Sequence, residues 1–532
     1  MREGGRMVED IKDKESELPM QVVSICPGCF QEGEIKTIPA LLIEKSNQIW
    51  IVKNCPKHGR FEDIVFRDAQ LWRKWMRYQS IGRAPKGPIL LGYPGGEELY
   101  EKHRSWPLLV NLLVTNRCNL RCWYCFMNAG RAGYVYDPPL EVLKEMMLAA
   151  KEAGGIAIQI TGGEPTVRED ILEILKFARE HFTHVQLNTN GIRLAEEIEF
   201  CKKLKGLINT IYMSFDGVTE KTNPWIEYSK KAIENLRKAG VRSVVLVPTV
   251  HRQNLEEMGK VVRYAIENRD VVRGVIFQPI AMAGSIRQIN EKFLREQRVD
   301  YVDLFEVLEK EFNKEITRWD FYPVPFVDPI RKLIEKIRSK EYPQFSPNPM
   351  CGGATYVFWD REQKKAVPIT RFIDVERFME FVSNNLLKKQ GVLVNLKIGF
   401  LLLTNLKKFI IKENLPKGLE NLGSIIAKAL IKGDYSSLGE FHYNTILIGS
   451  MWFQDPWNIQ LKPRVERCVI QYITEEGLMS FCLYNGLGFG EELRKKYGMA
   501  IKEWEEETGK KLIDDIWEKA RKNPVLLTGK SK

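Results

Sequence analysis

The stretch "NRCNLRCWYCF", residues 116–126, decides the fold. It places Cys118, Cys122 and Cys125 at CxxxCxxC spacing, with an aromatic residue directly before the last cysteine. Thiolates are the usual ligands of an iron–sulfur cluster, and a cubane cluster normally takes four of them. Three cysteines in so short a loop predict a cluster with one iron left open for a substrate or cofactor. A zinc knuckle that borrows a remote ligand is the alternative.

Short apolar runs alternate with longer amphipathic stretches between about residue 106 and residue 282. The runs are "LLVNLLVTN", "GIAIQITGG", "HVQLNTNG", "TIYMSFDG", "SVVLVPTV" and "GVIFQPI". This alternation predicts an α/β fold of parallel strands with covering helices, either an open barrel or a doubly wound sheet. Polar clusters follow most of the runs. The carboxyl ends of parallel strands carry the reactive groups in both architectures, so we expect the site at that rim.

The cysteine motif and the polar clusters together resemble the radical S-adenosylmethionine (radical SAM) superfamily. The resemblance implies a partial (β/α)6 barrel, which we place at residues 86–282, and a [4Fe–4S] cluster on Cys118, Cys122 and Cys125. It also implies that S-adenosylmethionine fills the open iron and is cleaved to a 5′-deoxyadenosyl radical, which abstracts hydrogen from unactivated carbon. A reductant such as ferredoxin is the implied partner.

The same resemblance implies which residues hold the cofactor. "TGGEP" (161–165) resembles the motif that receives the methionine amino group, and "NTNG" and "SFDG" resemble the segments that meet the ribose and carboxylate. For any single residue, turn or cap chemistry is the alternative. The candidate cofactor-binding residues are Tyr124, expected against the adenine, with Gly162, Gly163, Glu164, Asn188, Asn190, Ser214 and Asp216.

Two short knuckles, "CPGC" (26–29) and "CPKHG" (55–59), flank a β-rich stretch near the start of the chain. CxxC and CxxH on a hairpin are typical of a rubredoxin-like or zinc-ribbon site. We therefore predict a small metal-binding domain over residues 1–85. A structural zinc is one interpretation and a rubredoxin-like iron is the other, because the ligand types do not decide between them. The predicted ligands are Cys26, Cys29, Cys55 and His58.

Residues 283–532 contain three widely separated cysteines, Cys351, Cys468 and Cys482. One interpretation is an auxiliary [4Fe–4S] cluster with a non-cysteine or open fourth position. The other is that they are free buried cysteines. We predict a mixed, mainly helical carboxyl region that carries the auxiliary cluster and binds lipid.

The run "GVLVNLKIGFLLLTNLKKFIIKENLPKG" (391–418) has a wide apolar face, and lysine is its only charged residue before Glu413. "LGSIIAKALIKG" (422–433) repeats the basic amphipathic pattern. Each run is either a core helix or a helix that lies in a bilayer interface or lines an acyl-chain tunnel. The runs are too short to span a membrane.

The head, the barrel, "TYVFWDREQKKAVPITRFIDVERFMEFV" (355–382) and the cysteine-bearing tail resemble the archaeal tetraether lipid synthases over nearly the whole chain. The resemblance implies an enzyme that couples terminal carbons of the isoprenoid chains of archaeol-type phospholipids through an sp3–sp3 bond. The alternatives are a methyltransferase acting on a methanopterin precursor, a peptide-modifying enzyme and an iron–sulfur electron carrier. The sequence leaves the exact lipid, the electron donor, the number of auxiliary clusters and the oligomeric state open.

The composition is that of an ordinary multidomain protein, with 532 residues, 44% hydrophobic and 28% charged. The net charge of +11 is spread along the chain with acids among the bases, so we expect no nucleic-acid partner. The polar start lacks the apolar core of a secretory signal, and ten cysteines without such a signal favour metals over disulfides. We expect a cytoplasmic enzyme that contacts the inner face of the membrane.

Overall fold

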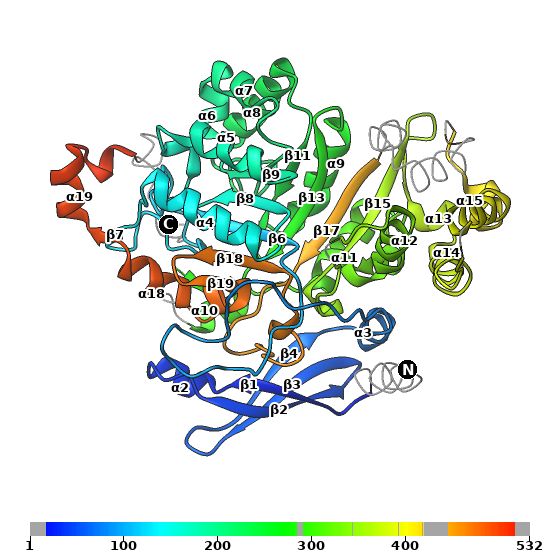
Figure 1. Ribbon diagram of the computed structural model, residues 1–532, viewed down its shortest axis with the longest axis horizontal. Helices are drawn as coiled ribbons and strands as arrows, with labels where there is room; N and C mark the ends of the chain where they lie inside the picture. The colour runs from blue at the N-terminus through cyan, green and yellow to red at the C-terminus, as the bar shows by residue number, and fades with distance from the viewer. Residues whose placement is uncertain are drawn as a thin grey trace.

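The computed structural model describes residues 17–284, 291–342, 344–391, 393–417, 419 and 445–515 (Figure 1). The second predicted basic run, residues 422–433, lies outside the described residues. Among the described residues, every helix is too short or too polar to cross a lipid bilayer.

Each of the six apolar runs forms a strand, which confirms the predicted α/β pattern. Neighbouring strands pair in parallel, in the order in which they occur in the chain. The strands are β6 (Leu109–Leu113), β8 (Ala157–Thr161), β9 (His184–Thr189), β10 (Thr210–Ser214), β11 (Val244–Val247) and β13 (Val272–Pro279). The helices between them are α4 (Leu140–Glu152), α5 (Ile171–His181), α6 (Ile192–Glu196), α7 (Ile198–Leu204), α8 (Ile226–Ala239) and α9 (Met258–Glu267).

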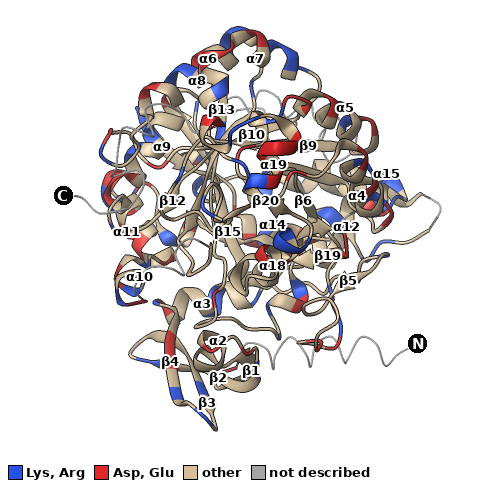
Figure 2. Cartoon of the chain, turned by 90° about the vertical axis from the view of Figure 1, so that its left-hand side faces the viewer, with Lys and Arg blue, Asp and Glu red and all other residues tan. Residues whose placement is uncertain are grey.

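These helices are amphipathic and cover the sheet (Figure 1). Helix α8, for example, buries Ile233 and Leu236 and pairs Lys230 with Glu227 and Lys238 with Glu234 on its outer face. Acidic and basic positions are correspondingly interspersed over the outer helices in Figure 2. The outer helix surface therefore presents mixed charge.

The carboxyl region adds strands to both edges of this parallel set. Strand β17 (Thr445–Met451) pairs in parallel with β13, and β18 (Ile470–Thr474) pairs in parallel with β6. Strand β15 (Gly352–Asp360) then pairs antiparallel with β17. The prediction of a mainly helical carboxyl region missed this contribution, because pairing with a strand far away in the chain leaves no local signal. The predicted domain boundaries remain predictions.

The first domain is a four-stranded antiparallel sheet that lies below the main sheet in Figure 1. The predicted hairpin is confirmed: Ser46 and Asn47 form its two-residue turn with φ of 54° and 58°. Positive φ at both positions is what a type I′ turn requires, and that turn matches the twist of the strands. The strands are β1 (Met20–Ile25), β2 (Thr37–Lys45), β3 (Gln48–Cys55) and β4 (Gly59–Phe66), with helices α2 (Pro27–Gln31) and α3 (Ala69–Met76).

This small sheet is fixed to the carboxyl region by buried contacts. The Leu461 backbone N–H donates to the Val23 carbonyl at 2.7 Å, and Lys53 Nζ donates to the Pro456 carbonyl at 2.9 Å. Lys53 is almost fully buried, so this bond satisfies a group that is costly to leave unpaired. The loop of residues 454–462 therefore rests on the amino-terminal sheet.

The first predicted basic run forms helix α15 (Val394–Asn405) at one end of the molecule (Figure 1). It packs through Ile398 and Leu402 on a small core that includes Leu333 and Phe378. The remaining helices and strands are β5 (Ile89–Leu90), β7 (Tyr134–Val135), β12 (Thr249–Val250), α10 (Glu291–Gln297), α11 (Tyr301–Glu311), β14 (Tyr322–Pro323), α12 (Asp328–Arg338), β16 (Lys365–Pro368), α13 (Ile369–Phe372), α14 (Val375–Phe381), β19 (Gly477–Ser480), α18 (Phe489–Lys496), β20 (Met499–Ala500) and α19 (Ile501–Thr508).

Candidate functional site

The two amino-terminal knuckles meet around one point. The Sγ atoms of Cys26, Cys29 and Cys55 and a nitrogen of His58 all lie within 4.8 Å of one another. Nδ1 of His58 lies 3.5 Å from Cys29 Sγ and 3.8 Å from Cys55 Sγ. Its Nε2 lies 3.1 Å from a carboxylate oxygen of Glu32. A carboxylate behind a ligating imidazole orients the ring, so the four side chains fit a tetrahedral metal ion.

Local structure prepares this metal centre. Cys26 caps helix α2, and the backbone N–H of Cys29 donates to its sulfur at 3.4 Å. Burial raises the pKa of Cys55, but hydrogen bonds from His58 and Lys57 outweigh it and lower the pKa to about 6. A Cβ on Gly28 would lie 2.6 Å from Cγ of His58, so the ring needs glycine there. The centre is thus preorganised for a metal, as the sequence predicted.

The second cysteine group lies in the loop between β6 and β7. Cys118, Cys122 and Cys125 are each half-buried. Burial raises the pKa of the Cys118 thiol, and the carboxylate of Glu164 and the neighbouring Cys122 raise it further. An uncompensated thiolate is therefore unfavourable here, and bound iron would supply the compensating positive charge. Within the described residues, only the amino-terminal cysteines and histidine lie close enough together to share one metal ion. The cysteines of this loop lie farther apart, as a cubane allows, because each thiolate binds a different iron.

The glycine motif holds the cysteine loop by its backbone. The N–H of Gly163 donates to the Thr115 carbonyl at 2.7 Å, and the N–H of Glu164 donates to the Arg117 carbonyl at 2.8 Å. A Cβ at Gly162 would lie 2.4 Å from the Thr115 oxygen, and one at Gly163 would lie 2.2 Å from the Arg117 oxygen. Both glycines are needed for this close approach.

The Glu164 side chain connects the ends of two strands. Its Oε1 accepts hydrogen bonds from the Thr166 hydroxyl at 2.6 Å and from the Thr189 hydroxyl at 2.8 Å. Its Oε2 accepts from the Asn190 N–H at 2.7 Å. The carboxylate is fully buried and used by these partners, so the structure gives it a positioning role in addition to any cofactor contact.

The other predicted cofactor residues also gather at the carboxyl ends of the strands. Nδ2 of Asn188 donates to Thr161 Oγ1 at 3.2 Å, and Nδ2 of Asn190 donates to Asn119 Oδ1 at 2.6 Å. Ser214 is the last residue of β10. The expectation that polar clusters share one rim is therefore met for this set.

Asp216 and Tyr124 link the cysteine loop to the end of β10. The Tyr124 hydroxyl donates to Asp216 Oδ2, and the Thr249 N–H donates to Asp216 Oδ1 at 2.7 Å. Burial raises the pKa of Asp216 to about 6. Beside Tyr124 lies His251, which sequence reasoning did not nominate; its Nδ1 is buried with no hydrogen-bond partner among the described residues. Nothing in the local sequence "VPTVHRQN" indicates that its single histidine lies beside Tyr124.

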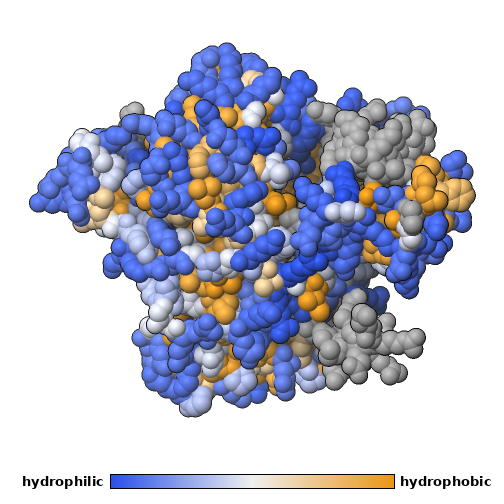
Figure 3. Space-filling view, viewed as in Figure 1, coloured by the Kyte–Doolittle hydropathy of each residue, from blue (hydrophilic) through white to orange (hydrophobic). Residues whose placement is uncertain are grey.

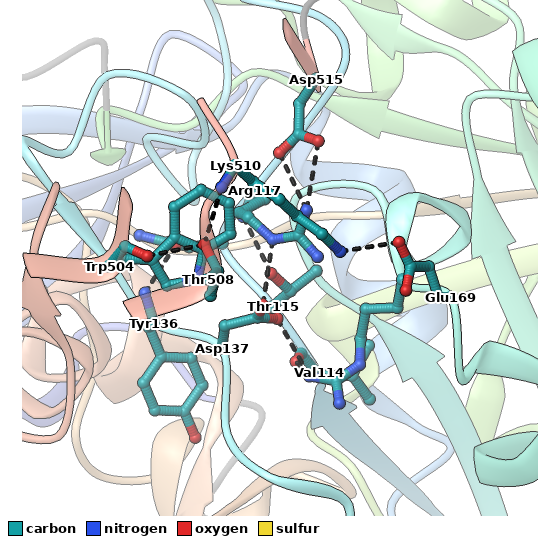
Figure 4. Close-up of polar contacts among 12 residues, drawn as sticks. Val114, Thr115, Arg117, Tyr136, Asp137, Glu169, Trp504, Thr508, Lys510 and Asp515 are labelled. Carbon is teal, nitrogen blue, oxygen red and sulfur yellow. Dashed lines mark hydrogen bonds and ion pairs between the residues drawn. The ribbon is translucent and has the colours of Figure 1, made fainter. Parts of the chain in front are cut away.

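Arg117 of the cysteine loop is held by acids from two directions (Figure 4). Its Nε donates to Asp137 at 3.1 Å, and its Nη1 donates to both oxygens of Asp515 at 2.9 and 3.2 Å. Lys510 pairs with Glu169 at 2.7 Å beside them. The two acids balance the charge of Arg117 and tie the loop to the carboxyl end of the described chain.

The three carboxyl-region cysteines are far apart in sequence but near enough in the fold to interact electrostatically. Cys351 ends a short turn before β15, Cys468 precedes β18, and Cys482 follows β19. Burial raises the pKa of Cys468, and the nearby Cys482 and Cys351 raise it further. Cys201 is instead fully buried in α7, where its thiol contacts the Leu194 carbonyl.

A narrow pocket, with about 20 Å³ of space for water-sized molecules, is lined by residues that neighbour both cysteine groups. Tyr124 and Phe126, which flank Cys125, are among the lining residues. Phe481, next to Cys482, lines the pocket beside Phe126. The further lining includes Thr249, Gln278, Ile280, Phe453, Gln454 and Asn485.

The cavity combines aromatic faces with amide groups. The rings of Phe453 and Phe481 stack at 3.8 Å with an interplanar angle of 17°, and Phe126 lies 5.7 Å from Phe481. Nε2 of Gln454 is buried and has no hydrogen-bond partner among the described residues. Such a lining suits a flat molecule that accepts hydrogen bonds at its edge.

Comparison with known proteins identifies the family. The Radical SAM superfamily model matches residues 112–265, and the HMPTM N-terminal zinc ribbon domain model matches residues 18–67. The chain is 41% identical to the 7,8-dihydro-6-hydroxymethylpterin dimethyltransferase of Methanocaldococcus jannaschii over 91% of this chain and 96% of that protein. The chain belongs to this radical SAM family. It therefore uses S-adenosylmethionine and a [4Fe–4S] cluster, and its zinc ribbon holds a structural metal.

Other relatives match shorter parts of the chain. The mycofactocin maturase MftC of Mycolicibacterium smegmatis is 26% identical over 30% of this chain and 42% of its own length. The solved structure of Streptococcus suis SuiB is 21% identical, with a TM-score of 0.28, over 33% of this chain and 40% of that chain.

The expectation of a tetraether lipid synthase is contradicted by these comparisons. The relative that covers nearly the whole chain carries the name of a pterin dimethyltransferase. The features behind the lipid interpretation, a cysteine-rich head, the radical SAM core and a basic apolar run, do not distinguish the two substrates. The prediction of an archaeol-type phospholipid as substrate was therefore wrong by this evidence, and the pterin alternative is the better supported one.

Proposed function

We propose that the chain is a radical SAM methyltransferase whose substrate is a reduced pterin. The observation that carries the proposal is the 41% identity to the Methanocaldococcus jannaschii dimethyltransferase over 91% of this chain. Because that relative is also matched over 96% of its length, the metal-binding head and the carboxyl region are shared along with the catalytic core.

The chemistry of the pocket lining supports this choice of substrate, and a bound pterin would require the pocket to widen from its volume of about 20 Å³. A pterin is a flat heterocycle with hydrogen-bond donors and acceptors along one edge. Phe453 and Phe481 offer aromatic faces, and the side-chain amides of Gln278 and Gln454 offer edge partners. The buried Nε2 of Gln454 gains a partner when a ring nitrogen or carbonyl accepts from it.

In this proposal Cys118, Cys122 and Cys125 hold the cluster, and the residues from the strand ends hold S-adenosylmethionine. Together the two groups supply the carbon-radical chemistry when bound. The chain contributes position and exclusion of water: Glu164 fixes the rim by its contacts to Thr189 and Asn190, and the aromatic residues line the space that the substrate enters.

We further propose that Cys351, Cys468 and Cys482 hold an auxiliary [4Fe–4S] cluster near the pocket, which Phe481 next to Cys482 lines. Cys351 lies close enough to raise the pKa of both Cys468 and Cys482, and the buried cation of Arg464 lies near enough to Cys482 to oppose that effect. A third cysteine group beside the substrate cavity fits a role in holding substrate or passing electrons.

The auxiliary cluster is tested by iron content. Cys468→Ala is expected to remove about four irons per chain, while Cys201→Ala removes none. The remaining cluster of Cys468→Ala should still change its electron paramagnetic resonance signal when S-adenosylmethionine is added. Unchanged iron in Cys468→Ala would end this part of the proposal and leave the methyltransferase proposal intact.

The activity is tested with anaerobically reconstituted enzyme, a strong reductant, S-adenosylmethionine and 7,8-dihydro-6-hydroxymethylpterin. We expect the pterin mass to rise by methyl groups and 5′-deoxyadenosine to form. Cys122→Ala should abolish both products, whereas Gln454→Ala should weaken pterin turnover without affecting the 5′-deoxyadenosine that forms in the absence of pterin. An unmodified pterin with abundant 5′-deoxyadenosine, or a coupled lipid when archaeol phospholipid is supplied, would overturn the proposal.

A further inference from the structure

Helix α15 exposes a continuous apolar stripe. Leu393, Leu396, Phe400 and Leu403 are 58%, 70%, 67% and 61% exposed, the highest values for large apolar residues in the part of the chain that the structure describes. Their spacing of three, four and three places them on one side of the helix. Figure 3 shows hydrophobic residues facing solvent at this end of the molecule. We call these four residues the α15 face.

The opposite side of the same helix is also apolar and is already used. Ile398 and Leu402 are fully buried, where they pack in the core that includes Leu333. A helix on the surface of a water-soluble protein normally turns a polar side outward. An exposed contiguous apolar patch instead marks a site of interaction. The packing of α15 on its own core therefore does not account for the exposed apolar stripe, which indicates that these side chains contact a partner.

The segment that contains α15 carries only positive charges between Glu380 and Glu413. From residue 381 to residue 412 the sequence contains six lysines and no aspartate or glutamate. All six are exposed, and none forms an ion pair with another described residue. They are Lys388, Lys389, Lys397, Lys407, Lys408 and Lys412.

We propose that the α15 face binds the surface of an anionic lipid bilayer. The four apolar side chains enter the boundary between headgroups and acyl chains, and the lysines contact the lipid phosphates. With 12 residues, α15 lies in the interface and does not cross the membrane. A second copy of this chain would bring the same lysines together and is disfavoured by charge. The proposal concerns where the enzyme works and is independent of the substrate.

Vesicle flotation with the full reconstituted chain tests this surface. Vesicles of equal parts phosphatidylglycerol and phosphatidylcholine should bind the chain, and pure phosphatidylcholine vesicles should bind it more weakly. Raising the salt concentration should weaken binding to the anionic vesicles. The triple variant Leu396→Ser, Phe400→Ser and Leu403→Ser should lose more than about tenfold in vesicle affinity. Lys407→Gln with Lys408→Gln should reduce binding to the anionic vesicles alone.

Leu148→Ser is the matched control, since Leu148 is an exposed leucine on the outer helix α4. It should bind vesicles as the unaltered chain does, and every variant should still form 5′-deoxyadenosine at the normal rate. Equal vesicle binding by the triple variant and the control would overturn the proposal. So would an absence of vesicle binding, or a dimer in size-exclusion chromatography that only the triple variant disrupts.

Discussion

The carboxylate of Asp515 accepts two hydrogen bonds from Nη1 of Arg117, and so joins the carboxyl end of the described chain to the cluster loop. Arg117 is buried, and removal of this partner leaves only Asp137 to balance it. We expect Asp515→Ala to lower the free energy of unfolding by about 1–3 kcal/mol and to speed the loss of iron to a chelator. Glu506→Ala, an exposed acid on α19, should change neither. Equal iron loss in both variants would show that Asp515 does not stabilise the loop.

Glu164→Gln replaces two acceptor oxygens by one acceptor and one donor. The new amide hydrogens face the Asn190 N–H or the two hydroxyls that Glu164 now binds. We expect a loss of about 2–3 kcal/mol in urea unfolding of the protein without cofactor. Glu169→Gln, an exposed acid paired with Lys510, is the control. If binding of S-adenosylmethionine falls while stability stays unchanged, Glu164 acts as a direct ligand and not as a positioning residue.

His251 makes stability depend on pH. Burial lowers its pKa to about 4, below the usual value near 6.5, so the folded chain binds fewer protons than the unfolded chain between these values. The contribution of neutral His251 to the free energy of unfolding is fully present above about pH 6.5 and is lost as the pH falls toward 4. We expect the unaltered protein to lose about 2 kcal/mol more than His251→Gln between pH 7.5 and pH 5. Parallel pH profiles of unfolding in the two proteins would exclude this.

Metal removal should loosen the amino-terminal sheet. Cys29→Ser removes one of four ligands, and we expect the bound metal to fall below one ion per two chains, with a lower melting temperature. Elemental analysis also decides between zinc and iron. Ser24→Ala, which alters a neighbouring buried hydroxyl without touching a ligand, should retain the metal. Full metal content in Cys29→Ser would exclude Cys29 as a ligand.

The sequence predicted the parts of the fold that depend on local pattern. The six core strands follow from apolar runs that alternate with helices, and the metal centre follows from two knuckles on a hairpin. The pairing of β17 with β13 and of β18 with β6 was not predictable, because each depends on contacts across hundreds of residues. Gln278 and Gln454 were missed for a related reason: a glutamine acquires a role only from the cavity in which it lies.

The substrate was the least predictable property. A radical site needs the same cysteines and the same strand ends whether its target is an isoprenoid chain or a heterocycle. The α15 run suggested lipid, yet in the structure it lies apart from the cavity residues, on a core of its own. Apolar character in one helix was therefore a weak guide to what the active site accepts.

Strand β6 pairs with β18, which the ribosome makes only after most of the chain has emerged. Until β18 is made, the edge strand β6 has unpaired backbone N–H and C=O groups. The opposite edge strand, β13, stays unpaired in the same way until β17 is made. Such late, long-range pairing slows folding and exposes intermediates to aggregation. Recombinant production should therefore gain more from slow synthesis at low temperature, or from added chaperones, than from trimming the carboxyl end, because truncation before residue 474 would leave the catalytic sheet permanently incomplete.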